Sequence, residues 1–321
     1  MAYTDLPLPL LRAHRSDSIA PDDFDERWAQ TLREARAVDR APTAVPVDSG
    51  LRLVDTFDLS FPGFGGDPVS GWLHVPHAAS APLPCVVEYA GYGGGRGLPH
   101  ERLVWAAAGY AHLVMDTRGQ GSGWSVGSTP DPAGSGPAHP GVMTRGVEDF
   151  DTFYYRRLVT DAVRAVDAAR SLPVVDEHRV LVAGVSQGGG LAIAAAGLSD
   201  GLRGALVDVP FLCDVPRALQ VTDTPPYDEV VRYLAVHRDA VDTVLRTFAY
   251  VDGAHHAARA DVPALFSVAL MDPTCPPSTV YAAYNAWAGP KDMVEYGFNG
   301  HEGGGAHHVQ RQLARARELL G

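Results

Sequence analysis

Cysteine is scarce in this 321-residue chain, and its three thiols, Cys85, Cys213 and Cys275, are odd in number and widely spaced. Such a set disfavours a disulfide framework or a zinc knuckle and fits a reducing compartment. No apolar run reaches the ~18 residues that a membrane span needs. The first residues also lack a positively charged segment followed by an apolar one, so we expect no signal peptide. Together these absences predict a cytoplasmic protein.

Basic residues are also in the minority. The 26 Lys and Arg against 38 Asp and Glu give a formal net charge of −12. No compact basic cluster stands out, which argues against a nucleic-acid partner. Hydrophobic residues make up 46% and charged residues 20%, as is ordinary for a globular protein with a substantial core.

Short apolar runs bounded by Gly, Pro or Asp alternate with helix-like segments through most of the chain. Strands that are apolar on both faces, separated by helices, are typical of a parallel sheet covered on both sides. The sequence therefore predicts an α/β fold, a mostly parallel sheet with helices on both faces. The apolar runs are residues 84–90, 111–117, 179–185, 204–210, 263–270 and 292–298.

Two segments depart from this alternation of apolar runs and helix-like segments. Residues from about 210 to 260 are helical in pattern without a strand among them, so we expect a helical insertion before the penultimate strand. Residues 121–147 are rich in Gly, Pro and Ser and predict a long surface loop. With an N-terminal arm and helix in residues 1–40, we expect one domain over residues 1–321.

The sharpest motif is Gly184-Val185-Ser186-Gln187-Gly188, which follows a predicted strand and precedes a predicted helix. This is the G-x-S-x-G nucleophile elbow in the strand–turn–helix context it requires. Its glycines allow a tight, strained turn and the close passage of backbones. The alternative is a glycine-rich turn whose serine merely caps the helix.

A serine nucleophile needs a base and an orienting acid, which follow it in that fold in the chain order serine, acid, histidine. Asp272, at the end of a predicted strand, and His301, after the last one, fit this order. Competing acids fall one strand early or on the wrong side of their strand. Competing histidines precede the acid or fall in the predicted terminal helix. These competitors are Asp208, Asp214, Asp261, His255, His256, His307 and His308.

Backbone N–H groups must stabilise the oxyanion of an acyl-transfer intermediate. We expect one from Gln187, directly after the nucleophile, and one from Tyr92 in the glycine-rich loop at residues 91–97. That loop lacks the Lys-Ser/Thr of a phosphate-binding loop and the register of a dinucleotide fingerprint, which disfavours a nucleotide cofactor. The adjacent histidine pairs diverge on a helix, so we expect no metal.

Arg118 follows another predicted strand. It either holds loops together by bidentate hydrogen bonds or is a surface arginine in a turn.

With these motifs the chain resembles the acetyl xylan esterase / cephalosporin-C deacetylase family, carbohydrate esterase family 7, of the α/β-hydrolase superfamily. The resemblance rests on RGQG at 118–121, GVSQGGG at 184–190 and HEGGG at 301–305. It covers essentially the whole chain, and it extends to residues 6–28, 89–97, 124–132, 208–214 and 265–285.

The resemblance implies a serine esterase without a cofactor. It would act inside the cell on acetylated xylo-oligosaccharides and cephalosporin-type acetates, as a homo-oligomer, specifically a hexamer. Residues 133–140 are where acyl or alcohol preference could differ from the family. The implied roles are nucleophile Ser186, acid Asp272, base His301, oxyanion donors Tyr92 and Gln187, supports Arg118 and Gln120, and site partner Glu302.

The function we expect is a two-step acyl transfer through an acetyl-serine. The alternatives are another acyl hydrolase of the same fold, such as a dienelactone-hydrolase-like or a dipeptidyl-peptidase-like enzyme, and a non-catalytic binding protein. Peptidases of that kind usually add a propeller domain, for which the chain has no room. A dinucleotide-dependent oxidoreductase is disfavoured by the register of the glycine-rich loop.

Overall fold

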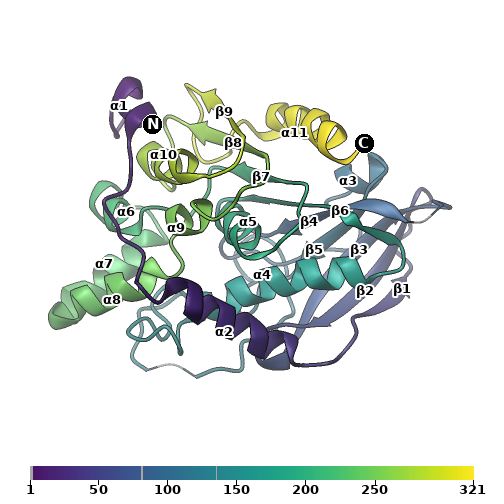
Figure 1. Ribbon diagram of the computed structural model, residues 1–321, viewed down its shortest axis with the longest axis horizontal. Coiled ribbons are helices and arrows are strands. Elements are labelled where there is room, and N and C mark those ends of the chain that lie inside the picture. The colour runs from purple at the N-terminus through teal and green to yellow at the C-terminus, as the bar shows by residue number, and fades with distance from the viewer. Residues whose placement is uncertain (1–2, 81, 135) are drawn as a thin grey trace.

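The sheet that carries the fold has nine strands in the order β1-β2-β3-β5-β4-β6-β7-β8-β9 (Figure 1). The structure is a computed structural model that describes residues 3–80, 82–134 and 136–321. Strands β1 to β3 and the β3–β5 pair are antiparallel, and all pairs from β5 to β9 are parallel. The bounds are β1 Thr43–Val47, β2 Val54–Pro62, β3 Pro68–Pro76, β4 Leu83–Tyr89, β5 Ala111–Met115, β6 Val175–Val185, β7 Gly204–Asp208, β8 Ala264–Ala269 and β9 Lys291–Tyr296.

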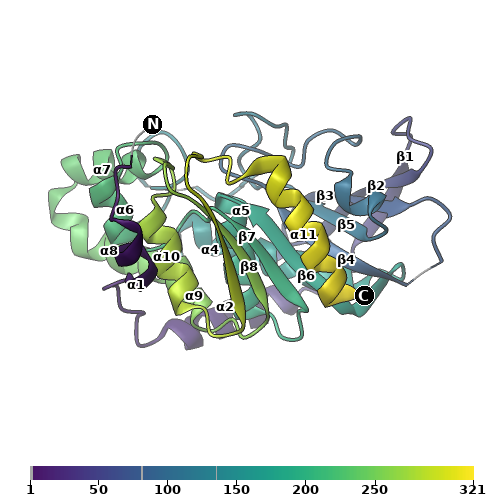
Figure 2. The same ribbon diagram turned by 90° about the horizontal axis from the view of Figure 1, so that it is seen from above.

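Helices cover both faces of this sheet, so the prediction of an α/β fold is confirmed. Figure 1 shows α3 and α11 on one side, with α2 and α4 on the other. Figure 2 shows the same separation of α11 from α4 from above. The helices are α1 Leu8–Ala13, α2 Phe24–Arg36, α3 Val104–Ala107, α4 Tyr154–Ser171, α5 Gln187–Leu198, α6 Val215–Val221, α7 Tyr227–Val236, α8 Val241–Ala249, α9 Gly253–Ala257, α10 Pro277–Ala286 and α11 Gly305–Leu320, with short 3-10 turns at Phe64–Gly66 and Arg238–Ala240.

The central strands are apolar throughout because each buries both of its faces. Successive side chains of a strand point to opposite faces. Val87 of β4 therefore packs in the large core formed with α4 and α5, whereas its neighbour Val86 packs with Trp105 of α3 and Leu320 of α11. This double burial is the physical reason that the short apolar runs located the parallel strands β4 to β8, whereas the edge strand β9 is only partly buried.

The predicted helical insertion is present as α6 to α9, between β7 and the penultimate strand β8. The N-terminal arm is fastened to the end of this insertion. Trp28 of α2 is buried and donates its indole N–H to the carbonyl oxygen of Tyr250 at 2.7 Å. Phe24 of the same helix stacks against Tyr250.

Two sequence expectations need correction. Residues 121–147 lack helix and strand among their described positions, as expected, but they are not simply a surface loop, because Thr129, Met143 and Val147 are buried. The first strand, β1, was not predicted. Nearly all of its residues are exposed, so it lacks the buried pattern that reveals a strand.

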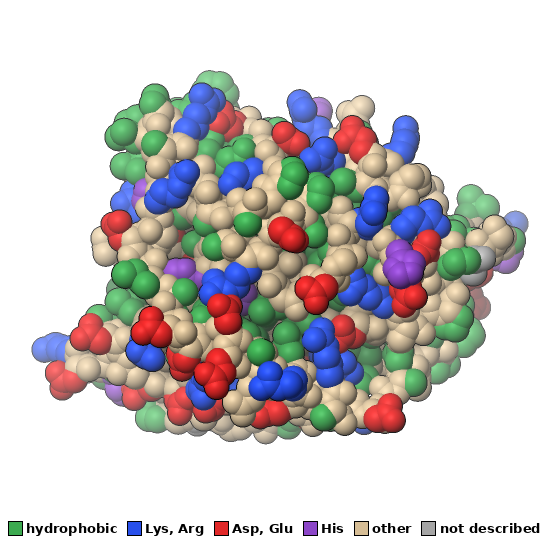
Figure 3. All heavy atoms as spheres, in the orientation of Figure 1, with side chains coloured by type: hydrophobic (Ala, Val, Ile, Leu, Met, Phe, Trp, Pro, Cys, Tyr) green, Lys and Arg blue, Asp and Glu red, His purple; other side chains and the backbone are tan. Residues whose placement is uncertain are grey.

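Two further features concern a membrane span and the distribution of charge on the surface. Among the described residues, no helix combines the length and apolar character needed to cross a membrane. On the face drawn in Figure 3, basic and acidic side chains are interspersed rather than gathered into areas of one sign.

Candidate active site

Ser186 lies at the sharp turn between β6 and α5, in a conformation that few residues adopt. Its φ is 59° and its ψ is −121°, the strained geometry expected of a nucleophile elbow. A Cβ at Gly184 would lie 2.2 Å from the backbone of Gly188, and one at Gly188 would lie 2.1 Å from the carbonyl oxygen of Tyr89. The glycines are therefore required. The Ser186 side chain makes no capping hydrogen bond, so the capping alternative is wrong.

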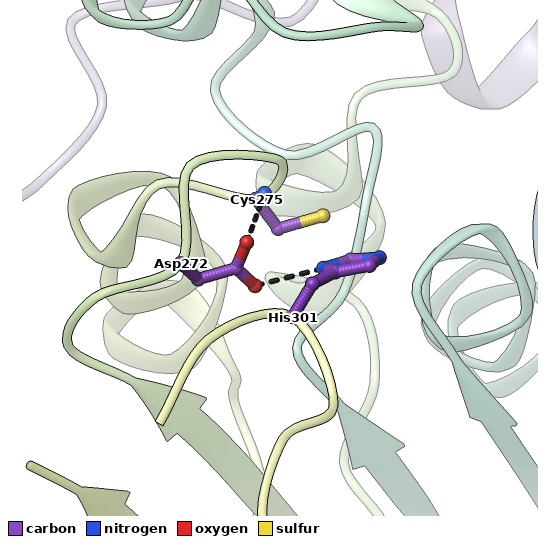
Figure 4. A group of neighbouring side chains, drawn as sticks. All are labelled: Asp272, Cys275 and His301. Atoms are coloured by element: carbon purple, nitrogen blue, oxygen red, sulfur yellow. Dashed lines mark hydrogen bonds and ion pairs between the residues drawn. The ribbon is translucent and has the colours of Figure 1, made fainter. Parts of the chain in front are cut away.

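Asp272 and His301 come together from the loops that follow two neighbouring parallel strands, β8 and β9. His301 Nδ1 donates to Asp272 Oδ2 at 2.8 Å (Figure 4). The other carboxylate oxygen accepts the backbone N–H groups of Thr274 at 2.8 Å and Cys275 at 3.0 Å. Asp272 is buried, whereas the His301 side chain is 33% exposed. The carboxylate is thus fixed from three directions, and the imidazole keeps one edge open.

Ser186 and His301 line the same cavity, whose volume is about 560 Å³. No hydrogen bond joins their side chains in the described part of the chain, and such bonds often tighten only when substrate binds. A hydroxyl, an imidazole and a carboxylate in this arrangement can carry out nucleophilic acyl transfer. The other lining residues are Glu88, Tyr89, Gly91, Tyr92, Arg102, Trp124, Val185, Pro225, Pro226 and Thr274.

Tyr92 and Gln187, the expected oxyanion donors, come from the loop after β4 and from the first position of α5. Neither backbone N–H donates a hydrogen bond to another described residue, so both are available to a ligand. The Tyr92 side chain fixes its own turn, because its hydroxyl donates to Glu229 and accepts the N–H of Val142 at 3.0 Å. Burial, together with the Glu229 carboxylate, raises the pKa of the Tyr92 phenol.

Gln120 connects the two expected donors. Its Oε1 accepts the backbone N–H of Gly93 at 2.6 Å, one residue beyond Tyr92. Its Nε2 donates to the Gln187 side chain at 3.0 Å and to the Tyr154 hydroxyl at 2.9 Å. The structure therefore places Gln120 where it can set the spacing between the two turns.

Arg118 is fully buried outside the cavity, so the surface-arginine alternative is wrong. Its guanidinium makes a bidentate pair with Asp161 of α4, with distances of 2.5 and 2.9 Å. Nη1 also lies 3.3 Å from Asp131, in the 121–147 segment. Burial raises the pKa of Asp161, and the guanidinium opposes this shift. Arg118 thus ties the 121–147 segment to α4.

Glu302 is exposed and does not contact the side chains of the Asp272–His301 pair. It accepts the Asn299 side-chain N–H at 2.5 Å and the Gly300 backbone N–H at 3.0 Å. The hydrogen bond from Asn299 lowers the pKa of the Glu302 carboxyl. Its contacts fold the loop that presents His301.

The competing candidates have other neighbours. Asp208 Oδ1 lies 2.9 Å from His308 Nε2, and Asp214 Oδ2 lies 2.9 Å from His14 Nε2. His255 contacts the Ser18 hydroxyl at 3.1 Å. Asp261 is exposed. None of these competitors lines the cavity with Ser186.

Cys275 is a neighbour of this group that sequence reasoning treated as merely structural. Its Sγ and ligand atoms of Asp272 and His301 all lie within 4.8 Å of one another (Figure 4). Burial raises the pKa of the thiol well above its usual value, which keeps it neutral. These three could hold a cation, but it would compete with the hydrogen bond that joins Asp272 to His301. The sequence does show that Cys275 follows Asp272 by three positions, and this spacing could have indicated that the two side chains are neighbours.

A residue of the cavity wall, Trp124, and a residue that holds the wall residue Tyr92, Glu229, were also missed. Glu229 comes from α7 of the insertion, 137 positions from its partner Tyr92. Trp124 was noted only within a matching segment, and nothing in the sequence alone assigns it to the cavity wall.

Comparisons with known proteins agree on one family. A profile described as Acetyl xylan esterase (AXE1) matches residues 1–318. An acetyl xylan esterase from Paenibacillus sp. R4 is 36% identical with a TM-score of 0.93, covering 98% of this chain and 100% of that one. Acetyl xylan esterase 1 from Thermoanaerobacterium sp. JW/SL YS485 is 32% identical with a TM-score of 0.89, covering 99% and 100%. Acetyl esterase Axe7A of Xylanibacter ruminicola is 27% identical over 287 residues, which are 88% of this chain and 63% of that protein. This chain thus spans less than two thirds of that curated relative.

Proposed function

The chain belongs to the acetyl xylan esterase family, whose members are carboxylic ester hydrolases, and from this premise we propose that it removes acetyl groups from acetylated xylo-oligosaccharides at Ser186. The observation that carries the proposal is the Asp272–His301 hydrogen bond of 2.8 Å at the wall of the cavity that also holds the strained serine. The names of the two similar solved structures support acetylated xylan as the substrate class.

In the first step the Ser186 hydroxyl oxygen attacks the acetyl carbonyl carbon, and its proton passes to His301 Nε2. Asp272 stabilises the resulting imidazolium through Nδ1 without taking the proton. The carbonyl oxygen becomes an oxyanion held by the N–H groups of Tyr92 and Gln187, and losing one such donor typically costs about 3 kcal/mol. The intermediate then expels the sugar hydroxyl, which leaves with the proton from His301.

In the second step water replaces the sugar. His301 takes a proton from the water as its oxygen attacks the acetyl-serine carbonyl, and the same two N–H groups bind the new oxyanion. The collapse of this intermediate releases acetate and returns the proton to the Ser186 oxygen. The enzyme is restored, and one water is consumed for each ester cleaved.

The cavity of about 560 Å³ is far larger than an acetyl group, so it also receives part of the alcohol. An acetate of a cephalosporin presents the same reacting ester with a different alcohol, and we include it in the proposed substrate range. The acyl preference for acetyl rests on the family.

We propose a homo-oligomer as well, a hexamer by family resemblance. Its support is β1, an exposed edge strand in which Val45 is 60% exposed. Unpaired strand edges are templates for pairing with another chain. The three buried free thiols support a cytoplasmic location. Light scattering on the purified protein tests the assembly, and a monomeric mass would contradict it.

The deciding experiment measures acetate release from acetylated xylo-oligosaccharides and from cephalosporin C, side by side. Ser186→Ala should reduce turnover by a factor on the order of 10⁶. The matched control is Ser80→Ala, at an exposed position between β3 and β4, which should leave turnover unchanged. Near wild-type turnover in folded Ser186→Ala would refute the assignment. A wild-type protein that neither releases acetate nor reacts with a serine-directed phosphonate would instead be a binding protein.

A further inference from the structure

Trp124 lies at the wall of the cavity that holds Ser186 and His301, and its side chain is exposed yet fixed. The residue is 61% exposed, although indole is a large apolar surface. Its Nε1–H donates to the Tyr92 carbonyl oxygen at 2.8 Å. The ring packs on the glycine turn, where a Cβ at Gly94 would lie 2.4 Å from indole Cζ2. A ring held in this way loses little freedom when a ligand binds to it.

The main chain around Trp124 is held as firmly as the ring. The backbone N–H of Gly123 donates to the Gly93 carbonyl oxygen at 2.9 Å. On the other side, the N–H of Gly95 donates to the Ser125 carbonyl oxygen at 3.1 Å. The two loops therefore form one unit, with the aromatic ring one hydrogen bond away from the proposed oxyanion donor Tyr92.

A charged pair lies beside the ring in the same cavity. The Arg102 guanidinium is 5.7 Å from the centre of the Trp124 ring and pairs with the Glu88 carboxylate. The two charged side chains are about one fifth exposed, at 21% and 19%. One Glu88 oxygen pairs with Arg102 and the other lies 2.9 Å from His112 Nε2, so the carboxylate is fixed and the Arg102 guanidinium can offer its remaining N–H groups to a ligand.

This combination matches the surface of a sugar. A pyranose ring has an apolar face of C–H groups that packs on an aromatic ring, and a rim of hydroxyls that bonds to planar charged groups. An alkyl alcohol would contact the aromatic ring alone. A free acetate would need neither the aromatic ring nor the charged pair. The cavity has room for such a ring next to the ester.

We propose that Trp124, with Arg102 and Glu88, forms a binding subsite for a xylopyranose ring on the alcohol side of the ester. The inference rests on the proposed function, because it assigns that alcohol to a xylo-oligosaccharide. With the acetyl carbonyl between Ser186 and the N–H of Tyr92, the hydrogen bond from Trp124 to the Tyr92 carbonyl sets the subsite directly beside the reacting group.

The test compares Trp124→Ala with Trp124→Phe. Both variants lose the indole N–H that binds Tyr92, but only Trp124→Ala loses the aromatic face. We expect Trp124→Ala to raise KM for acetylated xylotriose about three- to tenfold over Trp124→Phe, as for the loss of an aromatic contact. The two variants should hydrolyse ethyl acetate, which has no ring to stack, with similar kcat/KM.

A second measurement is independent of catalysis. Calorimetric titration with unacetylated xylotriose should show binding to wild type and Trp124→Phe, and binding weakened about three- to tenfold in Trp124→Ala. Equal affinities in the two variants, or no binding to wild type at millimolar concentrations, would overturn the subsite. A protein that hydrolyses ethyl acetate but not acetylated xylotriose would refute the xylan function. The titration would then still decide the subsite.

Discussion

Two aspartate–histidine pairs lie near the carboxyl ends of neighbouring strands, and they differ in what surrounds the imidazole. In one pair His301 binds Asp272 through Nδ1, and its other edge opens on the cavity with Ser186. In the other, Asp208 ends β7, and its Oδ1 lies 2.9 Å from His308 Nε2. The angle between these groups is not that of a hydrogen bond. The His308 side chain is 1% exposed, against 33% for His301.

The second pair has no free edge. The hydroxyl of Tyr296 lies 3.1 Å from His308 Nδ1, and Gln312 donates to Asp208 Oδ2 at 2.8 Å. The His308 imidazole is enclosed by neighbours at both nitrogens and is 1% exposed, so neither a substrate nor a serine can reach it to transfer a proton. Proximity of an acid and a histidine therefore does not by itself make a catalytic base. The base needs one nitrogen fixed and the other facing a nucleophile in a cavity.

The largest effect is expected when each histidine is removed in turn. His301→Ala should lower kcat by a factor on the order of 10⁶, because the serine loses its base. It should cost less stability than His308→Ala, because the buried Asp272 carboxylate keeps the backbone N–H groups of Thr274 and Cys275. His308→Ala should do the opposite. It should cost about 2 kcal/mol of stability, because the buried Asp208 loses its neighbour, and leave kcat of the folded protein within about threefold. Steady-state kinetics and denaturant unfolding measure both quantities.

Loss of turnover in His308→Ala, at a temperature where circular dichroism shows the variant folded, would contradict these roles. A kcat within about tenfold of wild type in His301→Ala would contradict them as well. Either result would transfer the proton-accepting role away from His301.

A smaller effect is expected from the carboxylates. Asp272→Asn keeps the size of the side chain but cannot stabilise an imidazolium or hold the required tautomer, so kcat should fall about 10⁴-fold. Asp208→Asn is the matched control and should leave kcat within about threefold. The measurement is acetate release at saturating substrate. Comparable losses in the two variants would show that the pairs act as one network.

The sequence was sufficient for features whose cause is local. The elbow around Ser186 is set by glycines two positions before and after it, because no larger residue fits there. Asp272 and His301 follow strands that the apolar runs located, and the carboxyl ends of neighbouring parallel strands meet at one edge of the sheet. Strand position and chain order together were therefore enough to place the candidate pair.

Features that depend on distant segments were not predictable in the same way. Arg118 was correctly noted as a possible loop clamp, but its partner Asp161 is 43 positions away on α4 and has no local signal. The link from Tyr92 to Glu229 crosses 137 positions and depends on how the insertion packs. Such contacts are fixed by tertiary packing, which short-range periodicity does not encode.

A third histidine extends the comparison to a ring without a carboxylate partner. His256 is fully buried, packs edge-on against Phe24 and Trp28, and lies 3.2 Å from the Tyr250 carbonyl oxygen through Nε2. Burial, with smaller contributions from His255 and Arg259, lowers the pKa of His256 to about 3. The ring is therefore neutral in the folded protein, where it fastens the N-terminal arm to the insertion.

The smallest effect we predict follows from this burial. Below about pH 6.5 the unfolded chain takes up a proton at His256 that the folded chain refuses, so stability falls as the pH falls. His256 should contribute a slope of up to about 1.4 kcal/mol per pH unit between about pH 6 and pH 4. In His256→Gln that part of the slope should vanish, even though the variant loses some packing at every pH.

The matched control, His178→Gln, changes a side chain that is 87% exposed and should keep the wild-type slope. Denaturant unfolding at several pH values measures these slopes. An unchanged slope in His256→Gln would show that another group binds the proton, and the distinction between paired and unpaired buried histidines would then lose its energetic basis.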